Sequence, residues 1–148
     1  MNPFYDPAEN EILISLIRNG VNFIVVGGAA VQFYGVERAR PDIDILLQAT
    51  HHNSEALSNA LAEFGIVLNE LTLSDNKESH LPNPYGFIHL MTSISGVSYE
   101  KAEQQKVDAY VSSINLTVPI LSKKHLIASK KARGENKDIE DIQQLESA

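Results

Sequence analysis

The chain has 148 residues, 43% of them hydrophobic, so it can bury one core but is too short for two comfortable domains, and we expect a single domain over residues 1–148. Its formal net charge of -7 argues against a general nucleic-acid coat protein, because phosphate backbones are held mainly by Lys and Arg. The sequence contains no cysteine and no apolar run long enough to cross a bilayer, which excludes disulfides and thiolate zinc sites and favours a cytoplasmic protein without a membrane partner.

The first half of the chain alternates helical and extended patterns around a glycine pair. Asp6-Pro7-Ala8-Glu9 is typical of a helix start, with Asp as the cap and Pro in the first turn. A nearly continuous apolar run up to Val26 favours a buried strand, and Gly27-Gly28 follow directly. In chain order we expect a helix over 7–18, a strand over 21–26, a short helix over 29–34, a strand over 43–47, a helix over 50–64 and a strand over 66–73.

The second half predicts shorter elements and ends in two helices. In chain order we expect a loop or flap over 74–84, a strand over 85–92, a turn over 93–98, a helix over 99–105, strands over 106–112 and 116–120, and helices over 123–133 and 137–145. We expect the core-facing side chains of the last two helices to be Leu126, Ile127 and Ala128, and then Ile139, Ile142 and Leu145. Strands and helices without strict alternation favour an α+β (mixed α/β) fold, a mixed sheet with helices packed on it.

Asp42 and Asp44 are the first candidates for chemistry. Alternate residues of a strand project to the same side, so the two carboxylates would point together while Ile43 and Ile45 point the other way. Two neighbouring carboxylates repel unless a cation compensates, and Mg²⁺ or Mn²⁺ is a hard cation suited to oxygen ligands. Two acids that merely face solvent at the start of a strand remain an alternative.

Gly27-Gly28 separate a buried strand from a helix. Glycines at such a point allow backbone N–H groups to approach a phosphate closely. They are equally suited to making the turn tight, and the pair by itself does not decide between these roles.

The combination is more specific than either part: an apolar strand ending in Gly27-Gly28, then residues 29–41, then Asp42-Ile43-Asp44 opening a second strand. This pattern resembles the signature of the DNA polymerase β-like nucleotidyltransferases. The likeness extends to the small bacterial nucleotidyltransferase-like proteins that include toxin components of toxin–antitoxin pairs. It rests on residues 27–31, 34–35, 38, 42–44, 93–100 and 126–134, with Lys137, Asp138 and Asp141.

The resemblance implies a nucleotidyltransferase fold and the transfer of a nucleoside monophosphate from a nucleoside triphosphate to the hydroxyl of an RNA such as tRNA, a protein or a small molecule. Asp42 and Asp44 would bind Mg²⁺ or Mn²⁺. The residues implied to contact the nucleotide are Gly27, Gly28, Arg38, Lys130, Lys131 and Lys137. For the three lysines, a solvated helix face is an equally good explanation.

Two positions depart from the family pattern. His89 stands where the family commonly has a third carboxylate, and Arg40 replaces a Thr shortly before the Asp pair. Neutral imidazole can bind a metal but adds no negative charge, so His89 is retained as a metal candidate beside the alternative of a hydrogen-bonded structural histidine. Asp108, on a later strand, is a candidate replacement for the missing acid.

His89 also motivates a second hypothesis. Loss of a metal-binding carboxylate would leave a catalytically degenerate module of the same fold, which binds a nucleotide or a partner such as an antitoxin-like protein without turnover.

Overall fold

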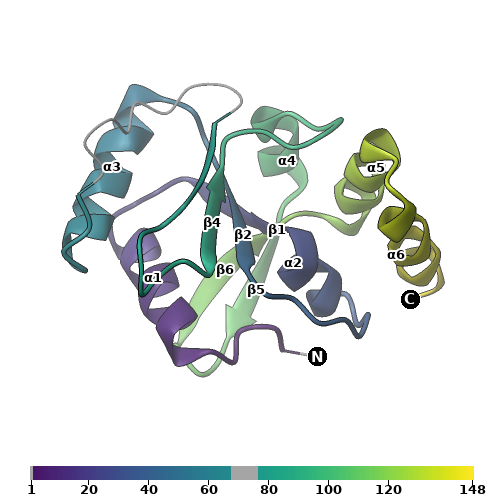
Figure 1. The fold of residues 1–148 in the computed structure, drawn as a ribbon, viewed down its shortest axis with the longest axis horizontal. Helices are drawn as coiled ribbons and strands as arrows, with labels where there is room; N and C mark the ends of the chain where they lie inside the picture. The colour runs from purple at the N-terminus through teal and green to yellow at the C-terminus, as the bar shows by residue number, and fades with distance from the viewer. Residues whose placement is uncertain (1, 68–76) are drawn as a thin grey trace.

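The computed structural model describes residues 2–67 and 77–148 (Figure 1). The elements in chain order are α1 (Pro7–Arg18), β1 (Phe23–Val26), α2 (Gly27–Phe33), β2 (Ile43–Leu47), α3 (His51–Ala62), β3 (Glu78–His80), β4 (Ile88–Met91), α4 (Tyr99–Gln105), β5 (Val107–Val111), β6 (Leu116–Ile120), α5 (Lys123–Arg133) and α6 (Asn136–Ser147). No helix in these two described stretches is long and apolar enough to span a bilayer.

Six strands form one mixed sheet in the order β3-β4-β2-β1-β6-β5. Strand β1 runs antiparallel to β2 and parallel to β6, and β2 runs parallel to β4. The outer strands β3 and β5 are antiparallel to their neighbours. The expected mixed α/β architecture is therefore confirmed.

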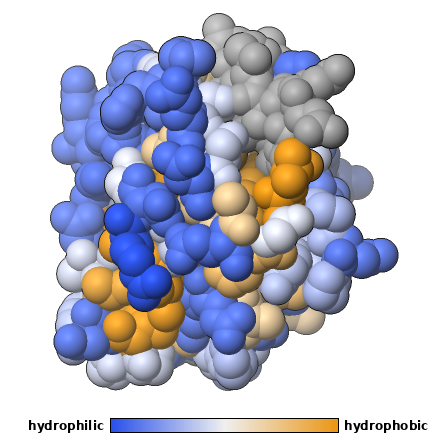
Figure 2. All heavy atoms as spheres, turned by 90° about the vertical axis from the view of Figure 1, so that its left-hand side faces the viewer, coloured by the Kyte–Doolittle hydropathy of each residue, from blue (hydrophilic) through white to orange (hydrophobic). Residues whose placement is uncertain are grey.

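Helices cover both faces of this sheet. In Figure 1, α1 and α3 lie to the left of the sheet, and α2, α5 and α6 lie to its right. Helix α1 starts where expected, because the Asp6 carboxylate accepts hydrogen bonds from the backbone N–H groups of Ala8 and Glu9. Hydrophilic residues cover most of the face that α1 and α3 present to the solvent, and the apolar areas on that face are separate (Figure 2).

The two central strands form the middle of the core. All residues of β1 and β2 are buried except Asp44, which is partly exposed. A carboxylate within such an apolar strand costs free energy unless it has polar partners or a ligand. Asp44 is therefore the residue of these two strands that is a candidate for a functional role.

Several sequence expectations need correction. The loop expected over 74–84 contains strand β3, whose three residues are exposed at the sheet edge and so lack the apolar alternation that would reveal a strand. Helix α2 begins at Gly27, so the glycines form its first turn and do not precede it. The strand expected over 66–73 lies mostly outside the described residues, and residues 66–67 are not in a strand.

Candidate functional site

One row of side chains crosses four strands at the centre of the site. Strand pairing places Asp44 opposite Val26 on one side and opposite His89 on the other, and His89 opposite His80. Residues paired in register project to the same face of a sheet. The sheet therefore brings Asp44, His89 and His80 together on the face that carries α2 and α5.

Gly27 and Asp44 are in close contact. Gly27 has φ +63, and a Cβ atom at this position would lie 2.0 Å from Asp44 Oδ2. Only glycine satisfies both the left-handed backbone and this approach. The other carboxylate oxygen, Oδ1, lies 3.0 Å from His89 Nδ1, so the two oxygens of Asp44 face different partners.

His89 is held from three sides. Its Nδ1 meets Asp44, its Nε2 lies 3.5 Å from Glu78 Oε1, and its ring stacks on His80 with centroids 4.4 Å apart. With Nδ1 protonated, His89 donates to Asp44 and fixes the orientation of that carboxylate. Imidazole groups beside metal-binding carboxylates commonly act in this way.

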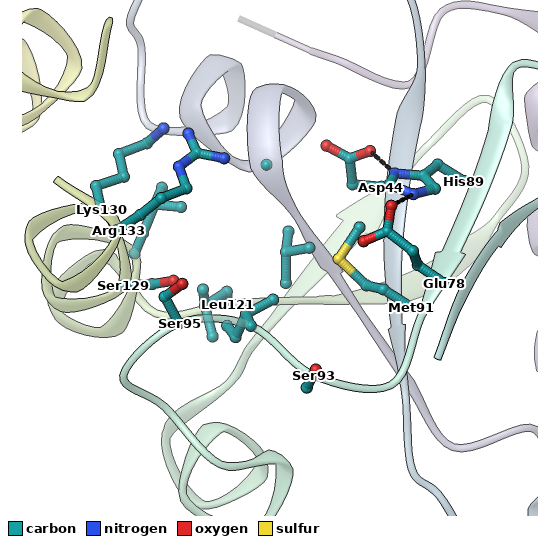
Figure 3. Close-up of a pocket in the computed structure, with 14 residues that line it drawn as sticks. Asp44, Glu78, His89, Met91, Ser93, Ser95, Leu121, Ser129, Lys130 and Arg133 are labelled. Carbon is teal, nitrogen blue, oxygen red and sulfur yellow. Dashed lines mark hydrogen bonds and ion pairs between the residues drawn. The ribbon is translucent and has the colours of Figure 1, made fainter. Parts of the chain in front are cut away.

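A cavity of about 490 Å³ lies between this row and α5 (Figure 3). Asp44, His89 and Glu78 lie on one side of it, and Lys130 and Arg133 project from α5 on the other. Between these charged walls the lining is apolar with three hydroxyl groups. Those intermediate residues are Val26, Gly27, Met91, Ser93, Ile94, Ser95, Leu121, Leu126 and Ser129.

Helix α6 supplies the counter-charges for the cationic wall. Lys130 Nζ lies 3.0 Å from Asp141 Oδ2 and 3.6 Å from Asp138 Oδ1, while Arg133 Nε lies 2.9 Å from Asp138 Oδ2. Arg133 Nη2 makes a second, short hydrogen bond to Asp138, and Arg38 Nη1 pairs with Asp141. Three cations thus share the two buried carboxylates, and Glu135 Oε2 also lies 3.9 Å from Arg133 Nε.

This network corrects the expected inner faces of the last two helices. Asp138 and Asp141 face inward together with Leu145, whereas Ile139 is 56% exposed. Ala128 is also exposed, although Leu126 is buried. The reason is that the basic side chains of α5 provide partners for acids, so polar residues occupy part of the interface that periodicity would assign to isoleucine.

The ion pair between Arg133 and Asp138 shifts the pKa of both groups. The hydrogen bond from Arg133 lowers the pKa of Asp138 to about 2, against the desolvation that would raise it. The same hydrogen bond raises the pKa of Arg133. Both partners of the Arg133–Asp138 ion pair are therefore charged at neutral pH.

Arg40 ties the loop before Asp42 to the N-terminal segment. Its guanidinium donates two 2.8 Å hydrogen bonds to the Glu9 carboxylate, and further bonds to Gln32 Oε1, to the backbone oxygen of Pro3 and to that of Asp42. The Arg40 side chain is only 4% exposed, and its pKa is raised because the paired carboxylate outweighs desolvation. Arg40 therefore has a structural role.

The other predicted site residues lie apart from the cavity lining. Lys131 and Lys137 have exposed side chains and pair with glutamates of the surface. Asp42 lies in a bend just before β2 and does not line the cavity within the described residues. Asp108 is exposed on β5, separated from β2 by β1 and β6, so it cannot replace an acid beside Asp44.

Sequence reasoning missed Glu78 and Arg133 as lining residues. Arg133 follows Lys130 by three positions, which places the two on one face of α5, so helical spacing could have indicated it. Glu78 carries no comparable signal, because its position depends on the pairing of β3 with β4.

The site suits a divalent cation only together with a ligand. In the part of the chain that the structure describes, no group of three or more His, Asp or Glu side chains is arranged to hold a metal ion. Mg²⁺ nevertheless binds to one or two carboxylates when phosphate oxygens and water complete its coordination. Asp44 lines the cavity and could supply one such carboxylate if a triphosphate occupies it, whereas Asp42, two residues earlier, lies outside the lining.

No protein-family model matches the sequence, and a search of the curated proteins finds no match. Solved structures do match. A Thermotoga maritima protein provisionally assigned as a nucleotidyltransferase has a TM-score of 0.64 at 17% identity, over 99% of this chain and 93% of its own. The lincosamide antibiotic adenylyltransferase LnuA, bound to lincomycin, has a TM-score of 0.61 at 19% identity, over 94% of this chain and 96% of its own. ANT(2")-Ia, in complex with adenylyl-2"-tobramycin, has a TM-score of 0.58 at 16% identity, over 95% of this chain and 86% of its own.

These likenesses extend over almost the whole chain at low sequence identity. They show that the chain has the nucleotidyltransferase fold, which adenylyltransferases share. The fold implied by the glycine pair and the Asp-Ile-Asp segment is thereby confirmed.

Proposed function

We propose that this chain, with its nucleotidyltransferase fold, transfers a nucleoside monophosphate from a nucleoside triphosphate to an acceptor hydroxyl. The observation that carries the proposal is the contact of Asp44 with Gly27, across a cavity from Lys130 and Arg133. A triphosphate needs cations and a close backbone, and its metal ion needs carboxylate oxygens. The cavity has both kinds of group, with the Asp44 carboxylate on one wall and the cations Lys130 and Arg133 on the opposite wall.

The chain's own residues divide the work. Lys130 and Arg133 attract the phosphates, Gly27 and Gly28 allow the backbone to approach them, and Asp44 with Asp42 would hold Mg²⁺ or Mn²⁺. The metal would neutralise negative charge that develops during transfer. His89 orients the Asp44 carboxylate through its Nδ1–H. Arg38 contributes indirectly, because it shares Asp141 with Lys130.

Incubation with triphosphates labelled at the α-phosphate tests this function. The acceptors are pooled tRNA, a protein mixture and small hydroxyl compounds, each with Mg²⁺ or Mn²⁺. Small molecules belong in the set because LnuA was solved with lincomycin and ANT(2")-Ia with an adenylylated tobramycin. We expect metal-dependent label transfer that Asp44→Asn abolishes. Equal transfer by the variant, or no transfer by the wild type, would refute the proposed enzymatic activity.

A binding module without turnover is the second candidate, favoured by one observation. His89 stands beside Asp44 at the position of the family's third carboxylate and occupies one of the oxygens of Asp44. Such a module would bind a nucleotide, or a protein such as an antitoxin-like partner, inside the cytoplasm. Calorimetry with magnesium-ATP separates the two: binding without label transfer supports the module, and turnover gained by His89→Asp would identify the lost carboxylate as the cause.

A further inference from the structure

Asp141, on α6, is bound to two cations from different parts of the chain. Its Oδ2 accepts a 3.0 Å hydrogen bond from Lys130 Nζ of α5, and the same oxygen accepts a hydrogen bond from Arg38 Nη1. The Asp141 side chain is 11% exposed and that of Lys130 only 7%. This buried oxygen therefore ties together three segments, namely α5, α6 and the loop that joins α2 to β2.

Arg38 connects this contact to the glycine pair. It lies in the loop between α2 and β2, and its Nε is 3.9 Å from the point that a Cβ atom of Gly28 would occupy. Gly28 is in the first turn of α2, where the proposed function brings the phosphates close to the backbone. Through Arg38 and Asp141, the ammonium group of Lys130 is held at a fixed place relative to that turn.

The ammonium group of Lys130 depends on such a support. A lysine carries its charge on a flexible four-carbon stem, so the stem alone does not define where the charge lies. Lys130 Nζ lies 3.0 Å from Asp141 Oδ2 and 3.6 Å from Asp138 Oδ1, and Lys130 lines the cavity. An ammonium group has three N–H donors, so the two carboxylates leave one donor for a ligand in the cavity.

We propose that Asp141 is a positioning residue, which aims the ammonium group of Lys130 at the bound triphosphate. This role rests on the proposed function, because it takes Lys130 as a phosphate-binding residue. Asp141 is not among the described residues that line the cavity, so it acts through Lys130. A cation that is already held in place binds a phosphate without first losing side-chain freedom, so the carboxylate increases the affinity for an anion of its own sign.

Calorimetry with inorganic tripolyphosphate tests this role without requiring turnover. Charge repulsion alone predicts tighter binding by Asp141→Asn, since the replacement removes a negative charge near the anion. We expect the opposite, a Kd raised about tenfold, because Asp141 and Lys130 belong to one network. In a Lys130→Gln background, the same replacement should raise Kd by less than about twofold, since the group that Asp141 positions is gone. A purely structural role would give the same factor in both backgrounds.

Glu146→Gln is the matched control. Glu146 is another acid of α6 that pairs with a lysine, but its partner Lys131 is exposed and lies 3.3 Å away at the surface. Its replacement should leave Kd within about twofold of wild type. Urea unfolding shows whether each variant is folded under the assay conditions. If Asp141→Asn is not folded, Asp141→Glu takes its place in both backgrounds, because it keeps the charge and moves the carboxylate, and its Kd should rise about threefold or more.

Three results would overturn the positioning role: unchanged or tighter binding by the folded Asp141 variant, equal factors in the two backgrounds, or no binding of tripolyphosphate by the wild type. The proposed function can fail separately. Binding that depends on Asp141 as expected, without transfer of labelled nucleotide to any acceptor, would refute the proposed transfer activity and support the positioning role.

Discussion

The buried carboxylate of Asp138 allows a quantitative test of how α6 supports the site. Asp138→Asn keeps the shape of the side chain and removes its charge. The pKa of Asp138 falls from 3.8 to about 2 in the folded chain, chiefly through the Arg133 hydrogen bond. Because each unit corresponds to about 1.4 kcal/mol, the ionised group stabilises the fold by about 2 kcal/mol at neutral pH.

The sign of the pH dependence follows from the lowered pKa. The stabilisation is complete above the unfolded pKa near 4 and is lost as pH falls through the folded value near 2. In urea unfolding at pH 7, we expect Asp138→Asn to lose about 2 kcal/mol relative to wild type. At pH 3 the gap should narrow by about 1 kcal/mol.

Asp108→Asn is the control for this experiment, because Asp108 is exposed on β5. It should change the free energy of unfolding by less than about 0.5 kcal/mol at either pH. If Asp138→Asn were as stable as wild type, or if its deficit were the same at pH 3 and pH 7, the ion pair with Arg133 would not be what holds α6 to α5.

Arg40→Met should lower the free energy of unfolding by about 3–5 kcal/mol in urea titrations, since it leaves a buried carboxylate of α1 unpaired; a change below about 1 kcal/mol would contradict the burial of that ion pair. Gly27→Ala should abolish label transfer, because its Cβ would collide with Asp44 and its backbone is left-handed at a cost of about 1–2 kcal/mol; normal transfer would show that this contact is not needed. Lys131→Ala and Lys137→Ala should each leave KM for the nucleotide within about twofold, because both side chains are exposed and paired at the surface; a tenfold rise in either would place that lysine in the site.

Local sequence signals were sufficient for most elements. Residues 99–105, 116–120 and 123–133 have the predicted bounds. For the helix over 123–133 the local signals are a cap at Ser122 and Gly134 at its C-terminal end, and in the structure Ser98 caps the helix over 99–105. The glycine pair and Asp44 were identified because a strand, a turn and a second strand lie close together in the sequence. Their contact across β1 and β2 follows from short-range pairing.

The missed features depend on long-range contacts. Glu78 enters the site through an edge strand of three exposed residues, which has no pattern of its own. Asp138 and Asp141 replace Ile139 on the inner face of α6 because of cations on another helix, and hydrophobic periodicity cannot anticipate a buried ion network. For the same reason, composition alone does not separate the basic residues of this part of the chain: Lys130 and Arg133 line the cavity, whereas Lys131 and Lys137 are exposed at the surface.

Metal and nucleotide binding can be observed together in a crystal soaked with Mn²⁺ and a non-hydrolysable triphosphate. We expect an anomalous manganese peak at the Asp44 carboxylate, with phosphate oxygens within hydrogen-bonding distance of Lys130 and Arg133. A nucleotide bound elsewhere, or manganese absent from Asp44 while the triphosphate occupies the cavity, would contradict this expectation.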